Sequence, residues 1–345
     1  MGIRESLLGS TALSPTREWR RFLTSRTFTP DRDMDVIIHA IGGGASGGVA
    51  NAGGYAVSLA TGGGAGAYVM KRVTLKAGVT YTFAIGAGGA AVVGSTSYPT
   101  RADGNDGGDT TVTGGGLAIV AGGGKKGTSR NGTSPHTTTL LNGGLGGIAS
   151  GGDVNRNGGR GGNVNAGSLT GNGSTYLAQA TGGGAVNLLG EAECRGGDIG
   201  PINYGTSSGL GSTGGAGIGE NGFNLANTGD STLGGGCGSI TGLGDAAATT
   251  LIARSFMGFW DKLGPRSSSS SVSSGPGAGN PGMSNSSYTP GEFAGGGSYA
   301  HFGASGTTSA ATYGGGSGGS AGGSTSTAPG SGKGGDGAIF LEILS

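Results

Sequence analysis

The sequence predicts a mainly β protein: an antiparallel β-sandwich closed by strands from the two ends of the chain, with a bundle of polyglycine-II-like helices and one α-helix insertion. Residues 35–41 are apolar on both faces apart from His39 and run directly into Gly42-Gly43-Gly44, which is typical of a central strand covered on both sides. The segment 337–344 is similarly apolar and is the expected partner strand. Between these two segments lie almost all of the 88 glycines in the 345-residue chain.

The glycine content places the chain near low-complexity sequences. Glycine and proline number 88 and 10, but no strict Gly-X-Y period occurs, which excludes collagen. Disordered chains are highly charged and poor in β-branched and aromatic residues, whereas only 11% of these residues are charged and the terminal segments are strand-like. We therefore expect an ordered and unusual fold.

Residues 1–33 have ordinary charge density and form a predicted N-terminal anchoring segment. Ser14 can cap a helix with Pro15 at its first position. Trp19, Phe22 and Leu23 then fall on one helical face at spacings i, i+3 and i+4. This short helix would either pack on the main body or dock the protein onto a larger assembly.

Residues 34–121 are predicted to be the β part of a glycine-rich domain that spans 34–345. Residues 66–75 and 80–86 are predicted to be the two arms of a hairpin around the turn 76–79. Shorter strands are expected in the segments 55–60, 109–113 and 117–121.

Residues 122–244 follow neither the strand period of 2 nor the helix period of 3.6. A period near 3 fits better, as in Asn157-Gly158-Gly159-Arg160-Gly161-Gly162-Asn163. Gly-Gly-X suits a polyproline-II-like helix with three residues per turn and no internal hydrogen bonds. Glycine lets such helices approach closely enough for backbone bonds between neighbours, and the X side chains then point outward or into a seam.

Residues 245–263 carry a strong α-helical pattern. Asp245 can cap the helix, and Gly264-Pro265 ends it. An apolar stripe follows helical spacing and comprises Ile252, Phe256, Phe259, Trp260 and Leu263. We expect this stripe to cover the edge of the glycine helices or a subunit seam. The remaining segment, 264–345, is predicted to contain glycine-rich loops and the closing strand.

Composition and spacing argue against several functions. The 20 basic and 19 acidic residues give a net charge of +1, so we expect no nucleic-acid partner. No signal-like or membrane-spanning apolar run is present, so we expect neither standard secretion nor membrane insertion. Cys194 and Cys237 could form one bridge or remain two buried thiols. The isolated histidines His39, His136 and His301 suggest neither a metal site nor a catalytic triad, and we expect no cofactor and no enzymatic activity.

Several stretches together resemble the glycine-rich domain of bacteriophage tail fibres and receptor-binding adhesins, over roughly Thr27 to Ser345. They are Phe28-Thr29-Pro30, Ile41-Gly42-Gly43-Gly44, Gly64–Tyr68, Leu75–Gly89, Gly104–Thr110 and Gly334–Leu341. The resemblance implies a virion protein of the phage tail that binds a bacterial surface receptor, either a glycan or an outer-membrane protein. It also implies contacts of the N-terminal segment with other tail or baseplate proteins, and a homotrimer.

Aromatic residues in glycine-rich loops offer rigid contact area for recognition. The receptor-binding candidates are Tyr98, Tyr204, Phe223, Tyr288, Tyr299 and Phe302. The assembly candidates are Trp19, Phe22, Leu23, Phe256, Phe259 and Trp260. Two alternatives stay open: a purely structural tail component, and a glycan depolymerase, because a catalytic carboxylate pair leaves no sequence motif.

Overall fold

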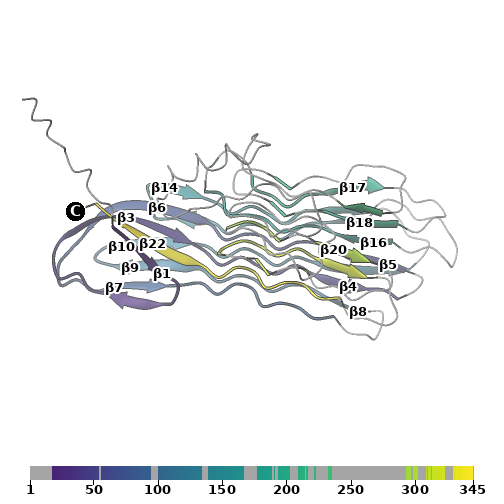
Figure 1. The fold of residues 1–345 in the computed structure, drawn as a ribbon, viewed down its shortest axis with the longest axis horizontal. Coiled ribbons are helices and arrows are strands. Elements are labelled where there is room, and N and C mark those ends of the chain that lie inside the picture. The colour runs from purple at the N-terminus through teal and green to yellow at the C-terminus, as the bar shows by residue number, and fades with distance from the viewer. Residues whose placement is uncertain are drawn as a thin grey trace, which may run out of the picture.

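The computed structural model describes most of the chain outside 235–292. The described residues are 18–53, 56–94, 100–133, 139–166, 177–188, 190, 193–202, 209–213, 215–216, 221–222, 232–234, 293–296, 298–301, 308, 310–311, 313–322 and 329–344. The chain forms an elongated body with strands at both ends and glycine-rich segments running between them (Figure 1). The described part is mainly β and contains no helix.

Two five-stranded antiparallel sheets form one end, which we call the base (Figure 1). The first sheet has the order β1 (Glu18–Phe22), β22 (Ala338–Ile343), β3 (Met34–Ile41), β6 (Tyr68–Leu75) and β14 (Val154–Arg156). The second has the order β13 (Ala149–Ser150), β10 (Leu117–Ala121), β9 (Thr110–Gly114), β7 (Tyr81–Ala84) and β2 (Arg26–Phe28).

Three further sheets, of five, three and four strands, form the opposite end, which we call the distal end (Figure 1). One has the order β11 (Ser129–Thr133), β5 (Ala56–Ala60), β16 (Leu177–Ala180), β18 (Gly209–Ser212) and β19 (Thr232–Gly234). The second has the order β12 (Thr139–Leu141), β15 (Val164–Ala166) and β17 (Ile199–Ile202). The third has the order β20 (Tyr299–His301), β21 (Ser320–Gly322), β4 (Val49–Asn51) and β8 (Thr100–Ala102).

The predicted pairing of the two apolar terminal strands is confirmed. β3 and β22 are antiparallel neighbours in the middle of the first base sheet, with Ile38 opposite Leu341 and Ala40 opposite Ile339. β3 is buried on both faces because its alternate side chains contribute to two different apolar clusters. The strand is therefore central, as its two apolar faces predict.

The main hydrophobic core lies between the two base sheets. Val36 and Ile38 of β3 meet Phe83 and Val112 of the second sheet in this core, and all four side chains are inaccessible to solvent. The turn 23–25 joins the two sheets at one pair of edges, and the turn 151–153 joins them at the other. Both edges of the core are therefore bridged by the chain itself.

A cluster of three polar side chains is buried on the face of the first base sheet that points away from the main core. His39 Nδ1 lies 2.8 Å from the hydroxyl of Tyr68, and His39 Nε2 lies 3.9 Å from a carboxylate oxygen of Glu342. Nε2 makes no hydrogen bond within the described part of the chain. Burial lowers the pKa of His39 to about 4, so the ring is neutral at pH 7.

Two local predictions for the base are wrong. Residues 18–22 form strand β1 instead of a helix, because pairing with β22 supplies hydrogen bonds that a short isolated helix lacks. Trp19 and Phe22 consequently lie on opposite faces, which alternate along a strand. The predicted hairpin is also absent: β6 pairs with β3 and β14, whereas β7 pairs with β2 and β9. The turn crosses between the sheets because each arm covers a different side of the core.

Glycine-rich segments connect the base to the distal end, and each is hydrogen-bonded to several neighbours. Along the segment 42–48, successive N–H groups bond to three neighbouring segments in turn and then return to the first. The bonds are Gly42 to Ala67, Gly43 to Gly108, Gly44 to Gly335, Ala45 to Gly64 and Ser46 to Asn105, each to the backbone oxygen at 2.8–3.0 Å. Bonding directions therefore repeat every three residues, and glycine segments from before and after Gly122 interleave.

Close approach explains why these positions are glycine. A Cβ atom placed on Gly44 would lie 1.9 Å from the carbonyl oxygen of Gly315, a backbone atom that cannot rotate away. Side chains occur where a segment reaches the outside of this set of hydrogen-bonded glycine segments, which we call the bundle: Lys125 and Leu145 are exposed. Others are small hydroxyl residues in the interior, such as Thr181, whose Oγ1 donates to the carbonyl of Gly162 at 2.6 Å. This is the outward or seam placement expected for the X positions.

The predicted α-helix 245–263 lies outside the described residues, as does Cys237. Cys194 is buried, and burial raises the pKa of its thiol to about 12. A protonated, buried thiol is a poor nucleophile, so Cys194 is a packing residue.

Candidate functional site

At the distal end, some described strands arrive from the base and others lead back to it. β4, β17 and β20 run toward this end, whereas β5 and β18 run back from it (Figure 1). Both ends of the described chain lie instead in the base, where Glu18 of β1 stands opposite Ile343 of β22. The fold thus separates the ends of the described chain from the distal sheets by the length of the glycine segments.

The structure places one receptor-binding candidate directly. Tyr299 is the first residue of β20 and stands opposite Ser320 of β21 at the distal end. The remaining candidates lie outside the described residues: Tyr98, Tyr204, Phe223, Tyr288 and Phe302. The described residues nearest in sequence to Tyr98, Tyr204 and Phe302 belong to β8, β17 and β20, which all lie at the distal end (Figure 1).

The described assembly candidates belong to the base. Trp19 is half-buried against the apolar cluster on the outer face of the first sheet, with its ring 5.5 Å from that of His39. Phe22 is buried in the main core, where the centroid of its ring lies 4.9 Å from that of Phe83. Leu23 is 36% exposed in the turn after β1. Phe256, Phe259 and Trp260 lie outside the described residues.

Sequence reasoning missed a polar groove at the distal end. The groove has a volume of about 340 Å³ and is lined by Arg101, Ala102, Asp103, Thr128 and Ser129, at the end of β8 and the start of β11, where both strands meet the glycine segments. Asp103 accepts hydrogen bonds from the backbone N–H and the hydroxyl of Ser129, at 3.0 and 3.2 Å. Arg101 is exposed. These residues come together only because β8 and β11 belong to neighbouring sheets, so no local motif could indicate them.

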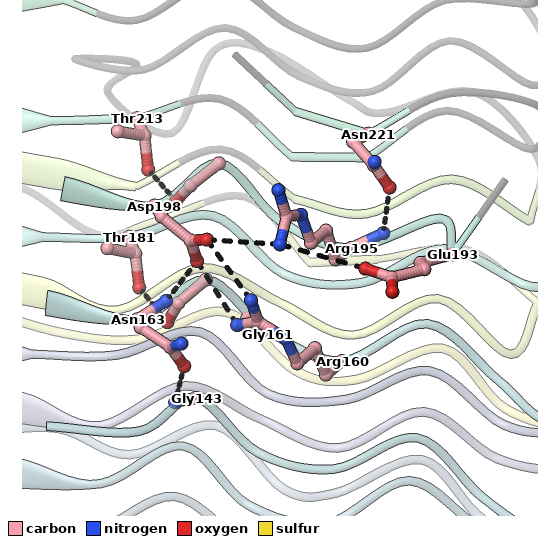
Figure 2. Close-up of polar contacts among 12 residues, drawn as sticks. Gly143, Arg160, Gly161, Asn163, Thr181, Glu193, Arg195, Asp198, Thr213 and Asn221 are labelled. Atoms are coloured by element: carbon pink, nitrogen blue, oxygen red, sulfur yellow. Dashed lines mark hydrogen bonds and ion pairs between the residues drawn. The ribbon is translucent and has the colours of Figure 1, made fainter. Parts of the chain in front are cut away.

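A cluster of charged and polar side chains joins two glycine segments, 157–163 and 193–198. Figure 2 shows Asp198 between Arg160 and Arg195. The Arg160 guanidinium donates two hydrogen bonds of 3.1 Å to the two Asp198 oxygens, and Arg195 Nη1 lies 3.5 Å from the same carboxylate. The backbone N–H of Asn163 donates to Asp198 at 2.7 Å.

Neighbouring side chains complete the same set of cross-links (Figure 2). The Asn163 side-chain oxygen accepts from Gly143 N at 2.9 Å, and the Thr213 hydroxyl donates to the carbonyl of Gly197 at 2.6 Å. The side-chain oxygen of Asn221 accepts from the backbone N–H of Arg195 at 3.0 Å. Each bond joins a side chain to the backbone of another segment, so this group positions the segments that lead to β15, β17 and β18.

The next feature is the set of side chains that could bind a metal ion. Within the described residues, no group of three or more His, Cys, Asp or Glu side chains is arranged to hold a metal ion. Nor does this part of the chain contain a helix long and apolar enough to cross a membrane. The chemistry available at the distal end is hydrogen bonding and charge, from groups such as Arg101 and Asp103.

Comparison with known proteins identifies the domain. No curated protein matches the chain. The sequence model of the glycine-rich domain family matches residues 23–251, which is more than half of the chain. The matched region begins just after β1 and includes the base strands β2 to β14, the glycine segments up to residue 251 and the described distal strands except β20 and β21; β22 lies outside it. The chain therefore belongs to the glycine-rich domain family.

Proposed function

We propose that this chain is a tail-fibre or tail-tip protein of a bacteriophage virion, which binds a bacterial surface receptor for host adsorption. The observation that carries the proposal is the separation described above: both ends of the described chain lie in the base, and the three other sheets lie at the opposite end of the glycine segments. Such a body can attach to a particle at the base and present its distal end outward. In this proposal the chain binds its receptor without catalysing a reaction on it.

The glycine segments would supply the stiffness that this role needs. We infer that they are polyglycine-II-like helices, because the N–H groups of Gly42, Gly43 and Gly44 bond to three different segments before Ala45 returns to the first. Each backbone bond contributes only about 1 kcal/mol net, so stiffness comes from many bonds acting together. In the same proposal the two base sheets are the closed sandwich that the sequence predicts, and the turns 23–25 and 151–153 close its edges.

The receptor surface would combine two parts of the distal end. The first is the polar groove of Arg101 and Asp103, which suits the hydroxyl groups of a glycan or the polar side chains of a protein loop. The second is the set of aromatic candidates, of which Tyr299 lies at this end. Rigid aromatic contacts beside adaptable polar groups are a common combination at recognition surfaces.

Cell binding tests the proposal. Fluorescently labelled full-length chain should stain host cells, and an excess of unlabelled chain should reduce phage adsorption to those cells. Arg101→Ala should weaken staining while leaving thermal unfolding unchanged, because Arg101 is exposed. Failure to stain cells together with failure to compete would refute receptor binding.

The structural alternative predicts a different result. If the chain only builds the tail, phages carrying alterations at Arg101 and Tyr299 should assemble and keep their host range. Release of fragments from host capsule or lipopolysaccharide by the purified chain would instead support a depolymerase.

A further inference from the structure

An exposed apolar strip runs along one side of the bundle. Leu140, Leu145 and Ile148 are 61%, 65% and 72% exposed, and they lie within nine residues of one another. The other large apolar side chains exposed in the described residues, Leu23 and Val93, lie far from this strip in sequence. Single exposed apolar residues are ordinary, but a contiguous set on one segment is typical of an interaction surface.

The segment 142–148 that carries Leu145 and Ile148 lies on the outside of the bundle. It is hydrogen-bonded to 61–67 behind it, to 122–128 on one flank and to 157–163 on the other. Leu145 and Ile148 are three residues apart, a rise of about 9 Å in a three-residue helical repeat, so they share one outward edge. The two side chains therefore form a ridge along the long axis.

A groove lies directly beside this ridge. It has a volume of about 370 Å³ and lies between the ridge and the flank formed by Asn157, Arg160 and Glu193. A ridge next to a groove is complementary to itself: rotation about a two-fold axis parallel to the ridge places the ridge of each copy over the groove of the other. Self-complementarity of this kind is the geometry of an isologous interface.

The charges on the two flanks of the ridge are complementary under the same two-fold rotation. Lys125, on one flank, is 57% exposed and pairs with Asp106 at 3.3 Å. Glu193, on the other flank, is 72% exposed and lies 3.7 Å from Arg195. Exposed pairs of this kind contribute little within one chain, so their partners can exchange on association. The two-fold rotation that seats the ridge in the groove also sets Lys125 of each copy opposite Glu193 of the other.

We propose that a second copy of this chain covers the strip, forming a parallel two-fold dimer in which Leu145 and Ile148 enter the groove beside Arg160 and Glu193. This two-fold dimer takes the place of the homotrimer that the resemblance implies. The parallel arrangement keeps both distal ends on the same side. Nucleic acid and acidic lipid fit the strip poorly, because both flanks carry paired charges of opposite sign. The dimer does not depend on which receptor the distal end binds.

Sedimentation equilibrium of the full-length chain tests the proposal. The wild-type chain should have twice the mass of one 32.7 kDa chain at micromolar concentration. The variants Leu145→Glu and Ile148→Glu should each raise the dimer dissociation constant by at least about tenfold, because central apolar contacts carry most of an interface's affinity. Val93→Glu is the matched control: Val93 is 76% exposed and outside the strip, so its dissociation constant should equal that of the wild type.

A charge exchange tests the orientation. Lys125→Glu and Glu193→Lys should each weaken the dimer, and the double variant should recover most of the wild-type affinity. All variants should keep the wild-type circular dichroism spectrum, which separates loss of pairing from loss of folding. A wild-type monomer at 100 times the concentration used would overturn the proposal, as would a trimer. A dimer unaffected by Leu145→Glu would overturn the assigned surface.

Discussion

Replacement of Gly44 by alanine tests whether close backbone contact holds the bundle together. The added Cβ would lie 1.9 Å from the oxygen and 2.4 Å from the carbon of the Gly315 carbonyl. Ordinary contact begins near 3.4 Å, so the two segments must separate by about 1.5 Å at this point. No side-chain rotation can relieve the clash, because both atoms belong to the backbone.

The hydrogen bonds around Gly44 determine how much free energy of unfolding the Gly44→Ala variant loses. Gly44 N donates to Gly335 O at 2.8 Å, Gly89 N donates to Gly44 O at 2.8 Å, and Gly335 N donates to Gly315 O at 2.9 Å. A separation of about 1.5 Å disrupts these bonds, and each buried group left without a partner costs about 1–3 kcal/mol. Alanine also lowers the conformational entropy of the unfolded chain, and this stabilising effect offsets about 0.4–1 kcal/mol of the loss. We therefore expect Gly44→Ala to lower the free energy of unfolding by at least about 3 kcal/mol, a large part of the typical total of about 5–15 kcal/mol.

Gly322→Ala provides the matched control. Gly322 lies in β21, and the nearest atom to its added Cβ would be Pro329 Cγ at 3.8 Å. This variant should melt at or slightly above the wild-type temperature, whereas Gly44→Ala should melt at least about 5 °C lower, by circular dichroism or calorimetry. Equal melting temperatures for the two variants would show that the segments separate at no measurable cost, and that close contact at Gly44 does not hold the bundle together.

Three further predictions concern buried side chains. Ile38→Asp or Ile339→Asp should abolish the folded circular dichroism signal, since each places a charge at a fully buried site, whereas Tyr299→Ala should keep the fold and alter only cell binding. Because burial lowers the pKa of His39 from 6.5 to about 4, the unfolded chain takes up its proton first, and about 3 kcal/mol of stability should be lost as the pH falls from 6.5 to 4. Between pH 6.5 and 4 the melting temperature should fall less steeply with pH for His39→Gln than for the wild type. Equal slopes would show that His39 is not the group responsible. Gln179→Leu should raise the melting temperature, because the buried Gln179 amide has no hydrogen-bond partner among the described residues; a lower value would show that the amide is satisfied.

The elements that could be predicted from sequence are those with a strong local pattern. The two apolar faces of residues 35–41 indicated a central strand, and the matching pattern near the C-terminus indicated its partner. The N-terminal helix and the hairpin failed because their local patterns were compatible with more than one pairing. For Trp19 and Phe22, the available edge of β22 decided the structure.

The candidate site was less accessible to sequence reasoning. Tyr299 could be proposed because an aromatic residue in a glycine background is conspicuous, but Arg101 and Asp103 carry no motif. Their groove exists because β8 and β11 belong to neighbouring sheets that meet at the distal end. The apolar ridge of Leu145 and Ile148 was equally hidden, since exposure depends on which segment lies outermost.

Local residue patterns were enough to predict that the chain is β-rich, that strands 35–41 and 337–344 pair, and that glycine permits close backbone packing. Which glycine segments are neighbours depends on the complete fold, because glycine has no side chain with which to specify a partner. Segment 42–48 is joined to 61–67, 103–109 and 329–337 mainly by backbone bonds, with one further bond from the N–H of Asn105 to the hydroxyl of Ser46. Their register depends on the strands at both ends, where side chains such as Ile38 and Ile339 select their neighbours.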